Sequence, residues 1–223
     1  MTLVRRSLTI AAKDLRIELR GRHATAAVLP FAATMLVVFG LALGPGRDLL
    51  RETAPGLLWV AVLFSSVLSF RQAYLAETED GALEGLVLSP VDRAAVFLGK
   101  GAAVLAGLLA LEAVALVLVV ALFDLPLGAP AVLAAAFALG TIGLSAVGSL
   151  FGALAQSARA REAVIPVLVL PLAVPVLLAG VRATALASAG RGGEAASWLG
   201  LLAAFDVVFV VLGILVFEHL LED

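Results

Sequence analysis

Residues 94–123 read AAVFLGKGAAVLAGLLALEAVALVLVVALF, and this stretch decides the fold. Its only charged residues are Lys100 and Glu112. A helix needs about 20 mostly apolar residues to cross roughly 30 Å of hydrocarbon. The stretch is therefore long enough to span a membrane as one helix.

The composition of the whole chain also indicates a membrane protein. Of its 223 residues, 62% are hydrophobic and 14% are charged, whereas soluble domains carry roughly 25% charged residues. The formal charge of -2 provides no basic field, so nucleic acid is not an expected partner. The chain has no cysteine and only two histidines, which leaves almost no ligands for a metal ion or for haem. We expect no directly bound cofactor.

Six apolar stretches are long enough to cross a membrane. The predicted spans are residues 24–43, 55–75, 94–123, 131–155, 163–181 and 198–220. Glycine-rich or proline-containing turns separate several of them. We therefore predict an all-α integral membrane protein with six transmembrane helices, in a single domain that covers residues 1–223.

The positions of the basic residues predict the orientation in the membrane. With a cytoplasmic amino terminus, eleven of the 15 lysines and arginines lie on the inner side. The outer loops hold the other four, which are Arg47, Arg51, Arg182 and Arg191. An even number of spans then places both termini in the cytoplasm.

Residues 1–23 predict an amphipathic helix that lies in the headgroup plane. Its apolar stripe consists of Val4, Leu8, Ala11, Ala12, Leu15 and Leu19. Ile10 and Ile17 fall outside this stripe, so the pattern is imperfect. A positively charged tail that only sets the topology is the alternative.

The cytoplasmic connection 77–93 predicts a short helix outside the membrane. Thr78 or Asp80 can cap an acidic helix that carries Leu83 and Leu86. Such a helix suits the docking of a cytoplasmic partner. A surface helix that only joins two spans has the same pattern.

Two acids, Glu112 and Asp206, lie well inside apolar runs. An ionised aspartate at the bilayer centre costs roughly 2.5–3.5 kcal/mol on insertion scales, so each acid should face the protein interior, a wet cavity or a partner. Two roles remain open for them. They relay protons or bind a cationic substrate, or they are protonated and hydrogen-bonded between helices.

Prolines and small residues mark two other spans. Pro166, Pro171 and Pro175 predict a kinked or interrupted fifth span, which is either a gate or a static bend. Small residues in the fourth span predict close packing against an unspecified helix. Trp59 and Trp198 are near the outer ends of their spans, where indoles prefer the lipid interface.

The chain carries no nucleotide-binding motif. Gly99-Lys100-Gly101 lacks both the earlier glycine and the hydroxyl residue of a phosphate loop. We therefore expect no enzymatic activity from this chain, and any ATP and Mg²⁺ would be bound by a partner.

Several motifs in order resemble the CcmB family, also called haem exporter protein B, the membrane subunit of the ABC-type cytochrome c maturation system. These are KDLRIELR at 13–20, EDGALEGL at 79–86 followed by Leu88-Ser89-Pro90, Gly99-Lys100, and the pairs Ile165-Pro166, Leu170-Pro171 and Val174-Pro175. The resemblance covers essentially the whole chain.

The resemblance implies an ABC-2-like permease in the bacterial inner membrane. Two copies would pair with two copies of the ATPase CcmA, and CcmC and CcmD would join them. The coupling helix received by the ATPase would contain Glu79, Asp80, Leu83, Glu84, Gly85 and Leu86. Haem is the implied cargo, and ATP hydrolysis would release the haem-loaded chaperone CcmE.

Three other functions remain open. One is an ABC-2 exporter for a lipid, glycan or drug, and another is a nonenzymatic scaffold of a haem-loading complex. The third is an ion-coupled secondary transporter that uses Glu112 and Asp206, although no convincing inverted repeat supports it.

Overall fold

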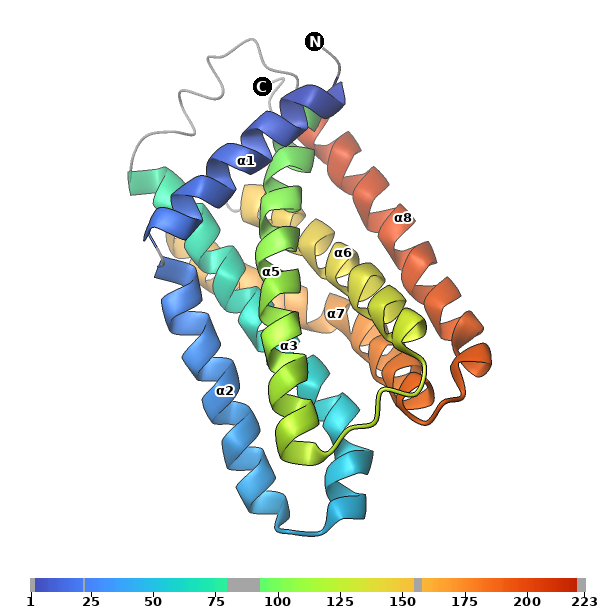
Figure 1. The fold of residues 1–223 in the computed structure, drawn as a ribbon. Coiled ribbons are helices and arrows are strands. Elements are labelled where there is room, and N and C mark those ends of the chain that lie inside the picture. The colour runs from blue at the N-terminus through green and yellow to red at the C-terminus, as the bar shows by residue number, and fades with distance from the viewer. Residues whose placement is uncertain (1–2, 22, 80–92, 155–157, 220–223) are drawn as a thin grey trace.

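The computed structural model describes residues 3–21, 23–79, 93–154 and 158–219, with side chains over 5–16, 28–70, 95–151 and 167–216. Its regular elements in this part of the chain are all helices (Figure 1). They are α1 (Leu3–Gly21), α2 (His23–Leu43), α3 (Arg47–Glu79), α5 (Arg93–Phe123), α6 (Pro130–Leu154), α7 (Ala158–Ser188), the short 3-10 helix η1 (Gly192–Ala195) and α8 (Ala196–His219).

The helices confirm a multi-pass membrane protein. Among the described residues, five segments are long and apolar enough to cross a membrane, and they lie in α3, α5, α6, α7 and in η1 with α8. The apolar part described for α2, Val28–Leu43, is shorter. All six predicted spans coincide with a helix. Five of these helices contain a segment of the required length, and α2 would be the sixth span.

The structure describes the two edges of the predicted connection 77–93. α3 continues to Glu79, so Thr78 lies inside that helix and does not start a new one. α5 begins at Arg93. The remaining residues, which include Asp80, Leu83, Glu84, Gly85 and Leu86, lie outside the described part of the chain.

The turns opposite α1 use backbone conformations that their residues allow. Gly44 and Gly190 have positive φ angles of 76° and 74°, which glycine adopts without steric cost. Asp124 also has a positive φ, of 53°. Arg51 of α3 holds this residue, because its guanidinium donates to the Asp124 carbonyl oxygen at 3.1 Å and to the Asp124 carboxylate.

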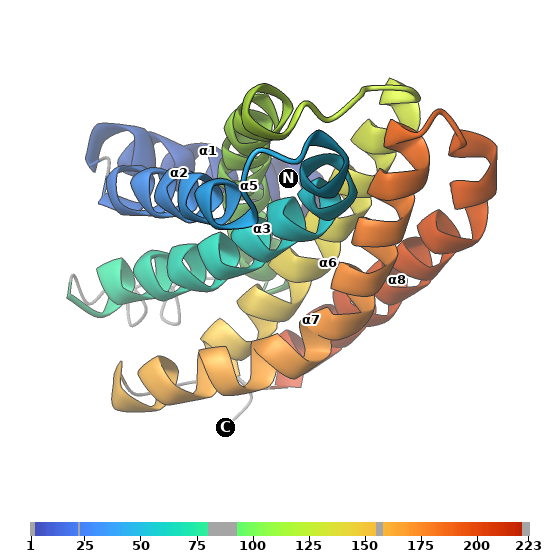
Figure 2. The same cartoon turned by 90° about the horizontal axis from the view of Figure 1, so that it is seen from below.

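Helix α6 is central in the bundle and contacts α3, α5, α7 and α8. Figure 2 shows α2 and α8 on opposite sides with α6 between them. Figure 1 shows α1 lying obliquely across one end of the bundle, where α3 ends and α5 begins. α1 packs mainly on α5.

The small residues of α6 are close-packed as predicted, and the structure identifies their neighbours. A Cβ atom added at Gly140 or Gly148 would lie closer than 3.0 Å to the ring of Trp59 or of Phe70, both on α3. A Cβ atom at Gly143 would lie 2.7 Å from Asp206 Oδ1 on α8. The absence of side chains at these positions therefore lets α3 and α8 approach α6.

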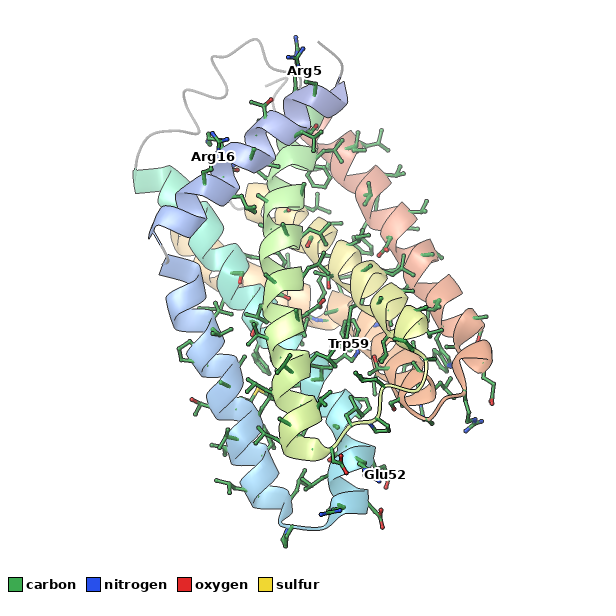
Figure 3. All side chains as sticks on the ribbon, viewed as in Figure 1. Arg5, Arg16, Glu52 and Trp59 are labelled. Carbon is green, nitrogen blue, oxygen red and sulfur yellow. The ribbon has the colours of Figure 1, made fainter. Side chains whose placement is uncertain are left out.

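The predicted position of Trp59 at the lipid interface is wrong. Trp59 is fully buried, and its indole nitrogen donates a hydrogen bond to Thr184 Oγ1 at 2.9 Å. Its ring lies against Gly140 of α6 and Gly180 of α7, and Figure 3 shows it inside the bundle. The slot for the indole is formed by glycines from distant segments, so the local sequence around Trp59 could not reveal it.

We expect the Gly99→Ala substitution to loosen α1. An added Cβ would lie 2.7 Å from Ile10 Cβ and 2.8 Å from the Ser7 carbonyl oxygen. Such overpacking typically costs about 1–3 kcal/mol, which corresponds to roughly five- to 150-fold more opening of the helix contact. Because the chain has no cysteine, Ser7→Cys provides a single buried thiol whose labelling by a water-soluble maleimide measures this opening.

Gly101→Ala is the matched control for this substitution. Its added Cβ would have Ser149 Oγ as its nearest neighbour, at an ordinary 3.6 Å. Equal thiol labelling in the two variants would contradict the described contact between α1 and α5.

Candidate functional site

Glu112 lies in the protein interior, as predicted for an acid in an apolar span. It is 1% exposed, and its neighbour is Thr141 of α6, with 2.5 Å between Thr141 Oγ1 and Glu112 Oε1. The other carboxyl oxygen, Oε2, has no hydrogen-bond partner among the described residues. The acid therefore joins α5 to α6 through one contact.

Two oxygen atoms lie within hydrogen-bond distance of the Thr141 hydroxyl group. Thr141 Oγ1 is also 2.7 Å from the carbonyl oxygen of Phe137. A hydroxyl group has only one hydrogen to donate. Both contacts are hydrogen bonds if Thr141 donates to Phe137 and a protonated Glu112 donates to Thr141.

We expect Thr141→Val to lower the free energy of unfolding by about 1–3 kcal/mol, because it leaves the buried Glu112 without a hydrogen-bond partner. Glu112→Gln should unfold close to the parent protein, since its amide can donate to Thr141 in the same way. Thermal unfolding in detergent measures both effects. If the double variant Glu112→Leu with Thr141→Val is as unstable as Thr141→Val alone, the unsatisfied acid is not the cause.

Asp206 is also interior, at 7% exposure. It lies on α8 against Gly143 of α6, and neither carboxyl oxygen has a hydrogen-bond partner among the described residues. The neighbouring rings of Phe205 and Phe209 stack with their centroids 4.3 Å apart. Asp206 is thus packed between α8 and α6, where the Phe205 ring also lies against Gly143.

The two acids lie on different sides of α6. Glu112 contacts Thr141 and Asp206 lies against Gly143, two residues further along the same helix. At about 100° per residue, these positions are about 200° apart around the α6 axis. The acids therefore lie at similar depth along α6 but are separated by it, which disfavours one site built from both.

A third buried charged group, Lys100, was missed as an interior residue by the sequence reasoning. It is 8% exposed, and its ammonium nitrogen lies 3.8 Å from Asp14 Oδ2 of α1. A lysine within the apolar stretch 94–123 could have indicated an interior position, but its partner Asp14 belongs to a segment about 85 residues earlier in the chain. Two motifs that carry the family resemblance, at 13–20 and at Gly99-Lys100, thus contact each other.

The three prolines of the predicted gate all lie within α7, which is helical from Ala158 to Ser188. The predicted interruption is therefore absent, and Figure 2 shows the helix bending along its course. Pro171 and Pro175 are exposed on the outside of the described bundle.

A hollow of 380 Å³ lies at the end of the bundle opposite α1. Asp48 and Glu52 of α3, Pro126 and Ser188 are among its lining residues. None of the site residues predicted from sequence lines it. Within the described part of the chain, no three His, Asp or Glu side chains lie close enough to hold a metal ion.

Known proteins resemble this chain over most of its length. The family model described as CcmB protein matches residues 5–222. A protein named heme exporter protein B from Pseudomonas aeruginosa is 38% identical over 175 residues, 77% of each chain. Proteins of the same name from Bradyrhizobium diazoefficiens and Haemophilus influenzae are 34% and 32% identical, over 90% and 92% of each chain. With its membrane helices and a match that spans nearly every residue, the chain belongs to the CcmB family.

Proposed function

We propose that this chain is the permease subunit of an ABC-type complex in cytochrome c biogenesis. A separate CcmA-like ATPase hydrolyses ATP, and the resulting motion rearranges the membrane helices and releases a haem-loaded CcmE-like chaperone. CcmC-like and CcmD-like proteins and a second copy of the chain complete the assembly. The match to heme exporter protein B over most of the chain carries this proposal.

The connection between α3 and α5 is the proposed coupling helix, with Leu83 and Leu86 at its centre. The packing of both flanking helices supports this role. α3 inserts Trp59 between α6 and α7, and α5 joins α6 through Glu112. A displacement of the segment between Glu79 and Arg93 would therefore reach the centre of the bundle through two helices. The proposed gate is α7, which carries Pro166, Pro171 and Pro175.

The proposed topology has six membrane spans, α2 included, in an ABC-2-like fold in the bacterial inner membrane. Both termini lie in the cytoplasm. The eleven basic residues expected on the inner side support this orientation. The position of α1 and of the end of α8 at the same end of the bundle agrees with it (Figure 1).

Deletion of the gene tests the proposed cargo. We expect c-type cytochromes to disappear while haem-loaded CcmE-like chaperone accumulates, and we expect the intact gene to restore both. A haem stain of membrane proteins measures the two species on one gel. Normal cytochromes after deletion would favour export of a lipid, glycan or drug instead.

The buried acids support one alternative, an ion-coupled secondary transporter. Such a transporter needs Glu112 or Asp206 to change protonation state, so Glu112→Gln with Asp206→Asn would stop transport. In an ATP-driven permease, the same double variant should still mature cytochromes.

A further inference from the structure

The side chains described for α1, residues 5–16, form three distinct faces, and the most buried face contacts the bundle. Ser7, Ile10 and Asp14 share that face at about 100° per residue. Ser7 is buried, Ile10 lies against Gly99, and Asp14 approaches Lys100. Ile10, which fell outside the apolar stripe, thus belongs to the protein contact.

The described part of the apolar stripe is left largely uncovered by the bundle. Leu8 is 62% exposed, Ala12 is exposed and Leu15 is half-buried. This stripe lies on a helix that crosses the end of a bundle of membrane helices (Figure 1). In that position, the boundary between headgroups and acyl chains covers an apolar stripe of this kind.

The third face is basic and exposed. It carries Arg5, Lys13 and Arg16, all of them exposed, and Figure 3 shows Arg5 and Arg16 pointing away from the bundle. Lys13 also lies 3.1 Å from Asp14, yet its side chain is 54% exposed. Because Asp14 additionally faces Lys100, the cluster as a whole is positive.

We propose that α1 binds acidic phospholipid headgroups through Arg5, Lys13 and Arg16. The apolar stripe enters the upper acyl region, and the three cations contact phosphates of the same leaflet. Basic residues beside an acidic membrane surface each strengthen binding about fivefold. Lipid thereby holds α1 against α5, in addition to the Asp14 and Lys100 contact.

A fluorescence experiment on the full chain tests this proposal. A dye on Thr9→Cys, the only thiol in the protein, reports lipids beside the exposed face. The protein is reconstituted in phosphatidylcholine vesicles that contain phosphatidylglycerol spin-labelled near the headgroup. Phosphatidylcholine with the same spin label serves as the reference, and the ratio of quenching gives the preference for acidic lipid.

We expect a preference for phosphatidylglycerol that weakens at high salt. The triple variant Arg5→Gln, Lys13→Gln and Arg16→Gln should lose it by roughly fivefold per residue. A control variant loses three positive charges at the end of the bundle opposite α1, through Arg47→Gln, Arg182→Gln and Arg191→Gln. This variant should retain the preference for phosphatidylglycerol. Protection of Ser7→Cys from maleimide in a parallel sample verifies that α1 remains on α5.

Two results would overturn the proposal. One is equal quenching by the two lipids in the parent protein, or an unchanged preference in the Arg5, Lys13 and Arg16 variant. The other is loss of a co-purifying protein partner from that variant with no change in lipid preference, which would assign the basic face to an acidic protein surface.

Discussion

Replacing Gly140 with valine should severely destabilise the folded bundle. The added side chain would occupy the volume of the Trp59 ring, because even its Cβ would lie closer than 3.0 Å to that ring. The indole cannot move away easily, since Gly180 contacts its other atoms and Thr184 accepts its hydrogen bond. Overpacking of this kind costs about 1–3 kcal/mol and more when no neighbour can yield.

Thermal unfolding in detergent, with the yield of monodisperse protein, measures this effect. Gly107→Val and Gly200→Val are matched controls, because an added Cβ at either position meets nothing within 4 Å. Both controls should unfold near the parent temperature. The smaller ring in Trp59→Phe should partly restore the stability lost in Gly140→Ala. Strictly additive losses of stability in the double variant would contradict the contact between the Trp59 ring and Gly140.

The double variant Leu83→Ala with Leu86→Ala should detach the ATPase. If each leucine fills a pocket on that subunit, its truncation costs about 1–2 kcal/mol, or roughly tenfold in affinity. The two together should remove most ATPase from the purified complex and stop cytochrome maturation. Quantitative co-purification and a haem stain measure the two effects.

A control for this variant is available at the opposite end of the bundle. Leu49 and Leu127 are exposed there, at 47% and 49%. Their double replacement by alanine should leave both ATPase content and cytochromes unchanged. Full ATPase recovery with Leu83→Ala and Leu86→Ala would move the docking site elsewhere.

The positions of the helices could be predicted from sequence because each apolar run is a local property. All six predicted spans coincide with a helix. The interior position of Glu112 and Asp206 follows from the same reasoning, since an acid in an apolar run avoids lipid. The start of α3 at Arg47, eight residues before the predicted span, could not be predicted from an apolar run, because its first turns carry polar residues such as Asp48 and Glu52.

The pairing of the helices could not be predicted, because it depends on residues far apart in the chain. The glycines of α6 indicated close packing but did not identify Trp59, Phe70 or Asp206 as their neighbours. The Thr141 contact of Glu112 joins residues 29 positions apart on different helices. Residues of the predicted coupling helix from Asp80 to Leu86 lie outside the described part of the chain, so their role stays a prediction.

Purification of this chain from its own membranes in mild detergent tests the central claim most directly. An ATP-driven permease predicts a nucleotide-binding subunit in the same complex, in a fixed ratio to this chain, and haem release from the CcmE-like chaperone only with ATP. A chain that purifies without any nucleotide-binding subunit and transports substrate on a proton gradient alone would contradict the proposed function.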